Sequence, residues 1–218
     1  MLKVAGSASD GRVRRVKLTA AGRRERAVLD RVSDAFARSM LEPLSDAQRT
    51  RLTTAMEEVE RLLVASMVTI GPAEPTSAAA RGCLAEYFAE LDARFEGGFD
   101  VRRALPVHAS EVSPPSGVLL IAWLRHEPVG CGALKRHEGD VAELKRIWVA
   151  PSARGLGLGR RLLEELERHA RESGAKLARL DTNRALTEAM ALYRRSGYRE
   201  VPPFNDEPHA HHWFERAL

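Results

Sequence analysis

Cysteine and long apolar runs are both scarce in this sequence of 218 residues. The two cysteines, Cys83 and Cys131, do not form a CxxC pair. They exclude a disulfide framework, so we expect a reducing cytoplasm as the compartment. The longest unbroken apolar run is the seven residues 118–124, whereas a membrane-spanning helix needs about 20. Residues 1–12 also lack the apolar core of a secretory signal. The sequence therefore predicts no association with a membrane.

Aromatic residues are few as well, at 6%, but a hydrophobic fraction of 44% is enough to form a core. The charged fraction of 29% fits a folded, soluble protein better than a disordered chain. Positive charge is uneven, since residues 1–65 hold 13 Lys+Arg against 9 Asp+Glu while residues 66–218 hold 21 of each sign. The basic cluster at residues 12–31 could contact phosphate, or it could be the solvated face of a helix.

Residues 1–65 are predicted to hold one strand and two amphipathic helices. The strand covers residues 13–18 and follows a turn at Asp10 and Gly11. Thr19 is placed to cap the first helix, and the segment 45–48 (SDAQ) is a capping box that opens the second. The apolar positions of the two helices are Val28, Val32, Phe36 and Met40, and Leu52, Met56, Val59 and Leu63. So small a segment cannot bury them, so we expect packing on the rest of the chain or on a second copy.

The remainder of the chain, residues 67–218, is predicted to form an α/β domain. Glycine and proline at 71–75 mark the boundary, a helix follows at 76–95, and a long connection occupies 97–117. Three strands that favour an antiparallel meander are then predicted at 118–125, 128–136 and 141–149. The last predicted elements are helices at 157–173 and 186–196 and strands at 176–181, 198–201 and 212–215.

A glycine-rich segment follows the strand that ends at residue 149. Gly155, Gly157 and Gly159 alternate with other residues, which lets the backbone approach an anion closely. The helix N-terminus that follows adds unsatisfied N–H groups and partial positive charge. Arg154 and Arg160 could add charge-assisted hydrogen bonds. The segment therefore predicts a cradle for a diphosphate.

Two common nucleotide motifs do not fit this segment. A GxGxxG fingerprint would place its third glycine at Arg160, and the Gly-Lys-Ser/Thr of a triphosphate loop is absent. A glycine-rich turn without a ligand is the remaining alternative.

The same residues resemble the GNAT N-acetyltransferases. Arg154-x-x-Gly157-x-Gly159 is similar to that family's acyl-CoA signature, residues 143–149 (ELKRIWV) resemble its fourth strand, and residues 191–198 (ALYRRSGY) resemble the helix and strand that follow. The resemblance covers about 67–218 and implies an α/β (α+β) fold with a mixed central sheet and flanking helices. It implies transfer of acetyl from acetyl-CoA to a primary amine of a small molecule or amino acid, by direct attack in a ternary complex and without a metal.

The resemblance also assigns residues to acetyl-CoA. The strand end would pair with the pantetheine arm, the N–H of Val149 would face the thioester carbonyl, and Asn183 would bind the pantetheine from the other side. The implied binding residues are Ile147, Trp148, Val149, Arg154, Gly155, Leu156, Gly157, Leu158, Gly159, Arg160 and Asn183.

Glu143 and Tyr193 are the candidate catalytic residues. Tyr193 lies where the family often has a general acid that protonates the departing thiolate, although it could be a packed helix residue. An amine must lose a proton before it attacks, and Glu143 is the candidate base. It lies six residues before Val149, and this even spacing would place both side chains on one face of a regular strand. The alternative is a carboxylate paired with Lys145 or Lys135.

The C-terminal histidines His209, His211 and His212 do not predict a metal site, because no cysteine or HExxH partner accompanies them. They could line an acceptor pocket or simply pack. Cys131 is expected to be a small buried strand residue rather than a catalytic thiol.

Residues 10–22 (DGRVRRVKLTAAG) resemble the wing and following helix of MarR-type winged-helix regulators. The segment from Leu44 onward resembles the end of that domain, whose terminal helices dimerise, so a MarR–GNAT fusion and a homodimer are implied. The helix that reads the major groove would precede Met1, so sequence-specific DNA binding is not implied. The alternative functions are a transcription regulator that senses acyl-CoA and an inactive module. The presence of both Glu143 and Tyr193 favours the enzyme.

Overall fold

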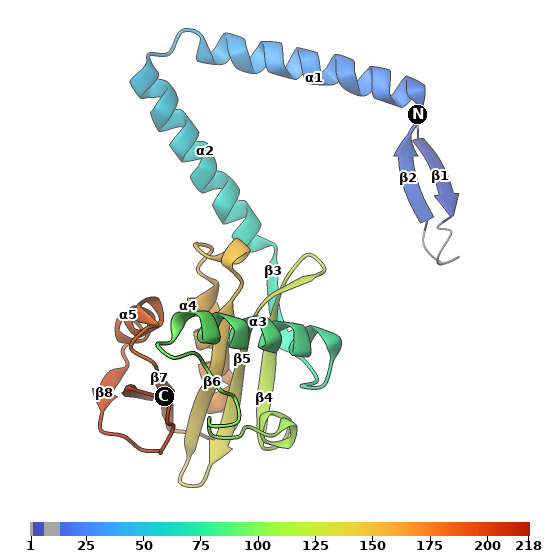
Figure 1. Ribbon diagram of the computed structural model, residues 1–218. Helices are drawn as coiled ribbons and strands as arrows, with labels where there is room; N and C mark the ends of the chain where they lie inside the picture. The colour runs from blue at the N-terminus through green and yellow to red at the C-terminus, as the bar shows by residue number, and fades with distance from the viewer. Residues whose placement is uncertain (1, 7–13) are drawn as a thin grey trace. The chain divides into compact units, whose positions relative to one another are not determined.

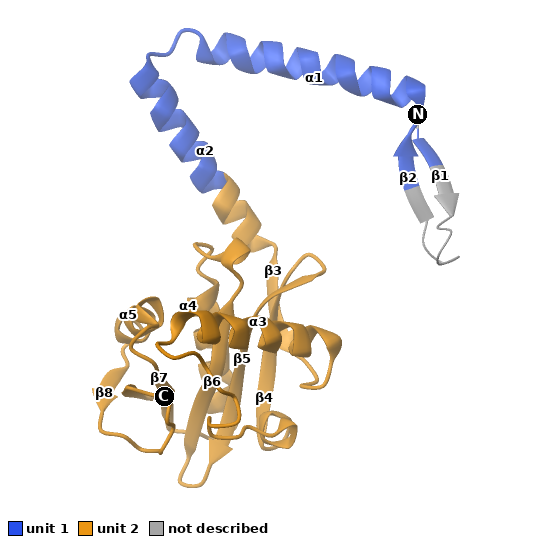
Figure 2. Ribbon diagram, viewed as in Figure 1, with its two compact units in different colours: residues 1–59 blue, residues 60–218 orange. Residues whose placement is uncertain are grey.

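The computed structural model describes residues 2–6 and 14–218. The chain divides into two compact units, residues 1–59 and 60–218 (Figures 1 and 2). Within the described residues, no helix is both long enough and apolar enough to cross a membrane.

The first unit contains two paired strands, the first long helix and most of the second. Strand β1 (Leu2–Gly6) pairs antiparallel with β2 (Arg14–Leu18). The strand predicted at 13–18 is therefore found, although Val13 and the predicted turn at Asp10 and Gly11 lie outside the described residues. The sequence analysis did not predict β1.

Both predicted N-terminal helices are present, and their caps are the predicted ones. Helix α1 (Ala20–Leu41) begins after Thr19, whose Oγ1 accepts a hydrogen bond from the Gly22 N–H at 3.1 Å. Helix α2 (Asp46–Ser66) begins after the capping box, in which the Ser45 N–H donates to Gln48 Oε1 at 2.9 Å. The eight apolar side chains of the two helices named above are between 39% and 66% exposed.

The second unit, every residue of which is described, is built on a seven-stranded mixed sheet in the order β3-β4-β5-β6-β7-β9-β8. The strands are β3 (Val68–Pro72), β4 (Gly117–Leu124), β5 (Glu127–His137), β6 (Val141–Val149), β7 (Leu177–Thr182), β8 (Arg199–Val201) and β9 (His212–Ala217). Only β6 and β7 are parallel neighbours, and β4, β5 and β6 form the predicted antiparallel meander. The sequence analysis missed β3, because the glycine and proline at its end were interpreted as a boundary. The edge position of β3 tolerates Pro72.

Helices cover both faces of this sheet (Figure 1). Helix α3 (Ala78–Arg94) packs on one face, in a cluster with Leu119 and Ile121 of β4. Helix α4 (Leu158–Glu172) packs on the other face with Leu120, and α5 (Thr187–Arg195) contributes to the same cluster. Short 3₁₀ turns occupy Ala109–Val112 and Pro151–Ala153. Successive side chains of β4 belong to the two clusters in turn, so both faces of this strand are buried.

A bulge in β6 changes the direction of its side chains. Lys145 pairs with Ala133 and Trp148 with Cys131, so β6 has one more residue than β5 between these pairs, and Arg146 has a φ of 57°. The prediction that Glu143 and Val149 share a face is therefore wrong. Val149 packs in the cluster that contains α4, and so do Ala142 and Leu144, so Glu143 between them points to the opposite face, which α3 covers.

Candidate active site

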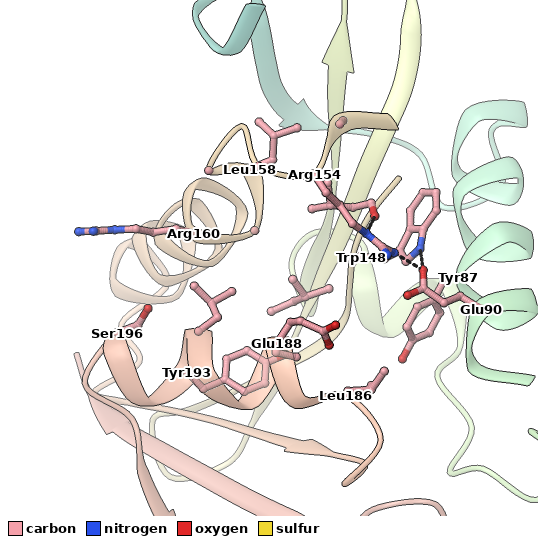
Figure 3. A pocket seen from close by; sticks show the side chains of 18 of the residues that line it. Tyr87, Glu90, Trp148, Arg154, Leu158, Arg160, Leu186, Glu188, Tyr193 and Ser196 are labelled. Carbon is pink, nitrogen blue, oxygen red and sulfur yellow. Dashed lines mark hydrogen bonds and ion pairs between the residues drawn. The ribbon is translucent and has the colours of Figure 1, made fainter. Parts of the chain in front are cut away.

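A cleft of about 570 Å³ lies beside the end of β6 (Figure 3). The pairing of β6 with β7 stops at Glu143 and Arg179, so the later residues of β6 have no neighbouring strand on that side. The structure brings together nine of the eleven predicted acetyl-CoA residues as lining of this cleft: Ile147, Trp148, Val149, Arg154, Gly155, Gly157, Leu158, Gly159 and Arg160. The other two are Leu156, which packs against the core, and Asn183.

The glycine loop presents its backbone to the cleft. Gly155 and Gly157 have φ values of 80° and 73°, in the left-handed region that favours glycine. On either side of the loop, the N–H of Arg154 donates to the Pro151 carbonyl and the N–H of Arg161 donates to the Gly157 carbonyl. The amides of residues 155–160 donate to no acceptor among the described residues. Because they precede or begin α4, they are unsatisfied donors of the kind that helix N-termini offer to anions.

The two predicted arginines do not point at this cradle. Arg154 Nη2 pairs with Glu90 Oε2 at 2.5 Å, and its Nε donates to the Val149 carbonyl at 3.2 Å. Arg160 extends away from the other labelled residues in Figure 3 and pairs with Glu164 Oε1 at 2.7 Å. The groups directed to the anion site are therefore backbone amides, while Arg154 connects the loop to α3.

Glu90 of α3 is a site residue that the sequence analysis missed. Its Oε2 also accepts the indole N–H of Trp148 at 2.8 Å, and its Oε1 pairs with Arg94 at 3.1 Å. Arg94 in turn pairs with Glu188 of α5 at 2.7 Å, so charged contacts run across the cleft from the loop to α5. Burial alone would raise the pKa of Glu90, but the Trp148 hydrogen bond and the arginines lower it. The only sequence signal was the i,i+4 spacing of Glu90 and Arg94, which is common on helix surfaces.

The N–H of Val149 faces the open side of β6. The next N–H, that of Ala150, donates to the Val129 carbonyl of β5 at 2.9 Å. Because successive N–H groups of a strand point to opposite sides, the Val149 N–H points away from β5. The Val149 carbonyl also points away from β5, where it accepts a hydrogen bond from Arg154 Nε.

Tyr193 lies where the cleft meets a second cavity of about 330 Å³. It is buried at 6% exposure, and this burial raises the pKa of its phenol well above the ordinary value. Its hydroxyl forms no hydrogen bond with the described residues. Tyr87 of α3 also lines both spaces, and burial raises its pKa in the same way. The sequence analysis missed Tyr87 because no motif marks α3.

Glu143 lies in a buried polar network instead of either cavity. Its carboxylate contacts His137 Nε2 at 2.5 Å, Lys145 Nζ at 3.2 Å and Asn205 Nδ2 at 3.1 Å. Burial would raise the pKa of Glu143, but the charge of Lys145 and the contact with His137 outweigh burial and lower it. Lys145 also pairs with Asp181 Oδ2 at 2.8 Å, and Asp181 does line the second cavity.

Asn183 and His209 belong to the second cavity. The Asn183 amide is engaged within the chain, since Nδ2 donates to the His209 carbonyl at 2.7 Å and Oδ1 accepts the Ala185 N–H at 2.9 Å. His212 is turned to Glu200 at 2.6 Å. Among the described residues, no three His, Cys, Asp or Glu side chains are grouped to hold a metal ion. Cys131 is fully buried in β5, as predicted.

Comparison with known proteins gives evidence on the family of this chain that does not depend on the geometry of the cleft. The sequence profile described as "Acetyltransferase (GNAT) family" matches residues 84–198. The IAA acetyltransferase of Azospirillum brasilense is 39% identical over 94 residues, which are 43% of this chain and 61% of that protein. The chain thus spans less than two thirds of this curated relative.

Two solved structures show the same fold. A Klebsiella pneumoniae protein, described provisionally as an acyl-CoA N-acyltransferase, is 30% identical with a TM-score of 0.57, covering 70% of this chain and 98% of its own. A GNAT acetyltransferase of Staphylococcus aureus is 20% identical with a TM-score of 0.59, covering 69% of this chain and 99% of its own. The mixed sheet with flanking helices is therefore shared with both.

Proposed function

The chain belongs to the acetyltransferase (GNAT) family, and on that premise we propose that it transfers the acetyl group of acetyl-CoA to a primary amine of a small molecule or amino acid. The observation that carries this proposal is the row of unpaired amides at residues 155–160. They lie at the start of α4, next to the strand edge that β7 leaves open.

Acetyl-CoA, when bound, supplies a thioester whose acetyl carbon an amine can attack. The amides of residues 155–160, including that of Leu156, would hold the diphosphate. Residues 147–149 would pair with the pantetheine arm as with an added strand. The Val149 N–H would donate to the thioester oxygen as negative charge develops there. Arg195, which lines the cleft from α5 without an acidic partner among the described residues, is placed to meet another phosphate.

Tyr193 is the proposed general acid. Its phenol reaches the junction of cleft and second cavity, where a departing thiolate would need a proton. Because burial raises its pKa, the phenol remains protonated at neutral pH and keeps that proton available.

The geometry favours a different residue from Glu143 as the general base. Glu143 lines neither cavity, and it is connected to Asp181 at the wall of the second cavity through Lys145 and Asn205. Asp181 Oδ1 forms no hydrogen bond with the described residues and belongs to a side chain at the cavity wall. We therefore assign proton removal to Asp181, with Glu143 positioning Lys145. Asn183 would act by shaping the loop after β7.

For residues 1–65 we propose a homodimerisation role. The segment contains the paired strands β1 and β2 followed by two helices, and the apolar residues of both helices are exposed. A second copy with two-fold symmetry could cover them. The acetyltransferase domain would then be residues 67–218.

A screen for release of free CoA tests the enzyme proposal. The purified chain is incubated with acetyl-CoA and amino acids, polyamines, aminoglycosides or peptides, and thiol release is followed. We expect release above the rate of thioester hydrolysis with at least one amine class. Acetyl-CoA binding without release for any acceptor would favour an acyl-CoA sensor instead.

A further inference from the structure

The second cavity is mostly apolar and adjoins the cleft. Rings of Phe88, Phe95 and Phe99 line one side, and Phe88 stacks on Phe99 with centroids 5.6 Å apart. Six residues line both spaces: Tyr87, Leu91, Ile147, Leu186, Ala189 and Tyr193. A molecule in this cavity would therefore meet the acetyl end of a ligand in the cleft.

Arg146 is a positively charged residue of this cavity that has no carboxylate partner among the described residues. It lies at the β6 bulge, and its guanidinium lies over the Phe88 ring, 5.6 Å from the centroid. The only hydrogen bond that this guanidinium donates to the described residues is a long one, 3.4 Å, to the Val107 carbonyl. Burial lowers the pKa of Arg146, because the charged form has lost water without gaining an anion.

The other charged side chains of the cavity have partners within the chain, and Asp181 Oδ1 is the carboxylate oxygen that remains without one among the described residues. Lys145 pairs with both Glu143 and Asp181. Glu207 accepts backbone N–H groups, from Leu105 at 2.8 Å and from His209 at 3.2 Å. The cavity thus contains one half-buried cation whose donors have room for a further acceptor.

A backbone at φ 57° is costly for arginine, and such strain persists where surrounding structure or function requires it. At this position the bulge turns both Lys145 and Arg146 to the α3 face, so the guanidinium enters the cavity instead of the core. Arginine presents a planar fork of donors that matches a carboxylate.

We propose that the acceptor amine carries a carboxylate, which Arg146 binds, and that the acceptor is an α-amino acid with an apolar side chain. This inference rests on the proposed function. The carboxylate and amine of an α-amino acid are attached to the same carbon. Binding the carboxylate at Arg146 therefore keeps the amine close to Ile147, which lines both spaces. The apolar side chain would lie against the phenylalanine rings.

Product binding tests this assignment without requiring turnover. N-acetylphenylalanine and its uncharged carboxamide are titrated into the full chain saturated with CoA, and affinities are measured by calorimetry. Because hydrogen bonds to charged groups are strong, we expect the acid to bind about 10- to 100-fold more tightly than the amide.

The matched variants are Arg146→Asn and Arg125→Asn. Both positions have positive φ, at 57° and 59°, a region that asparagine tolerates, but Arg125 is exposed at the β4–β5 turn. Arg146→Asn should remove the preference for the acid, and Arg125→Asn should keep it. Arg146→Lys, which retains a charge without the fork, should give an intermediate preference.

Equal binding of acid and amide by the parent, absent binding of both, or a preference that survives in Arg146→Asn would each overturn the assignment. These results differ from failure of the proposed function, which would appear as no CoA binding and no thiol release. If neutral amines released thiol while the acid had no advantage, the enzyme proposal would stand and the carboxylate proposal would fail.

Discussion

At the scale of single residues, Tyr193 carries the clearest catalytic prediction. Tyr193→Phe should lower kcat by about 10²-fold, the low end for general acid catalysis, because the thiolate would leave unprotonated. Affinity for acetyl-CoA should not change. Since burial raises the pKa of the phenol above its ordinary value of about 10, ionisation of Tyr193 should cause no loss of kcat as pH rises to 10.

The control for this variant is Tyr198→Phe. Tyr198 is buried nearby, but its hydroxyl donates to Glu167 at 3.1 Å and it lines neither space. Comparable loss of kcat in both variants would mean that general disruption, not acid catalysis, explains the effect.

Two single-residue variants distinguish Asp181 from Glu143 as the base. Asp181→Asn should slow the reaction about 10²-fold near pH 7, and the rate should recover as rising pH deprotonates the amine unaided. Glu143→Gln should have a smaller effect and keep the shape of the parent's pH–rate profile. The reverse pattern, with recovery only in Glu143→Gln, would restore Glu143 as the base.

The sequence predicted the cradle better than it predicted the base. Residues of the glycine loop are consecutive, so their placement follows from one local turn and one helix start. Glu143 was misplaced because a face was assigned by even spacing, and the bulge at Arg146 breaks that rule. Nothing local signalled the bulge, since arginine is not the residue expected at positive φ.

At the scale of elements, α4 is held to the end of the sheet by a buried charge. Glu167 is 2% exposed and accepts from Tyr198 and from Arg216 at 2.9 Å. Glu167→Ala leaves the partly exposed Arg216 charge without this partner, so we expect a loss of about 1–3 kcal/mol of unfolding free energy.

Urea denaturation measures this loss, with Glu164→Ala as the control. Glu164 lies on the same helix, but its pair with Arg160 is exposed to solvent, so its removal should change stability little. Equal losses of unfolding free energy in the two variants would show that the buried network stabilises the fold no more than an exposed ion pair does.

Most elements of the second unit could be predicted, because hydrophobic alternation and terminal glycines are local signals. The helices ending at Gly174 and Gly197 are examples, since both glycines have positive φ. Strand β3 could not be predicted in the same way. Its five residues end in Gly71 and Pro72, and only pairing with β4 makes them a strand.

At the scale of the whole molecule, we predict a dimer formed through α1 and α2. Phe36 is 66% exposed and Val32 is 62% exposed on α1, where a second copy would remove apolar surface from water. Light scattering on the full chain should give twice the monomer mass. Phe36→Glu should return it to a monomer, while Arg38→Glu on the same helix should not. A parent chain that is monomeric at micromolar concentration contradicts the prediction.

The central claim is that acetyl-CoA binds at the start of α4, and calorimetric titration of acetyl-CoA tests it most directly. Gly157→Glu puts a carboxylate beside the amides of the cradle, and Gly174→Glu puts one at the opposite end of the same helix. Both glycines have positive φ, 73° and 88°, with no neighbour within 4 Å of an added Cβ, so backbone strain is matched. We predict that Gly157→Glu abolishes binding and that Gly174→Glu retains the parent's affinity. Unchanged affinity in Gly157→Glu would contradict the account.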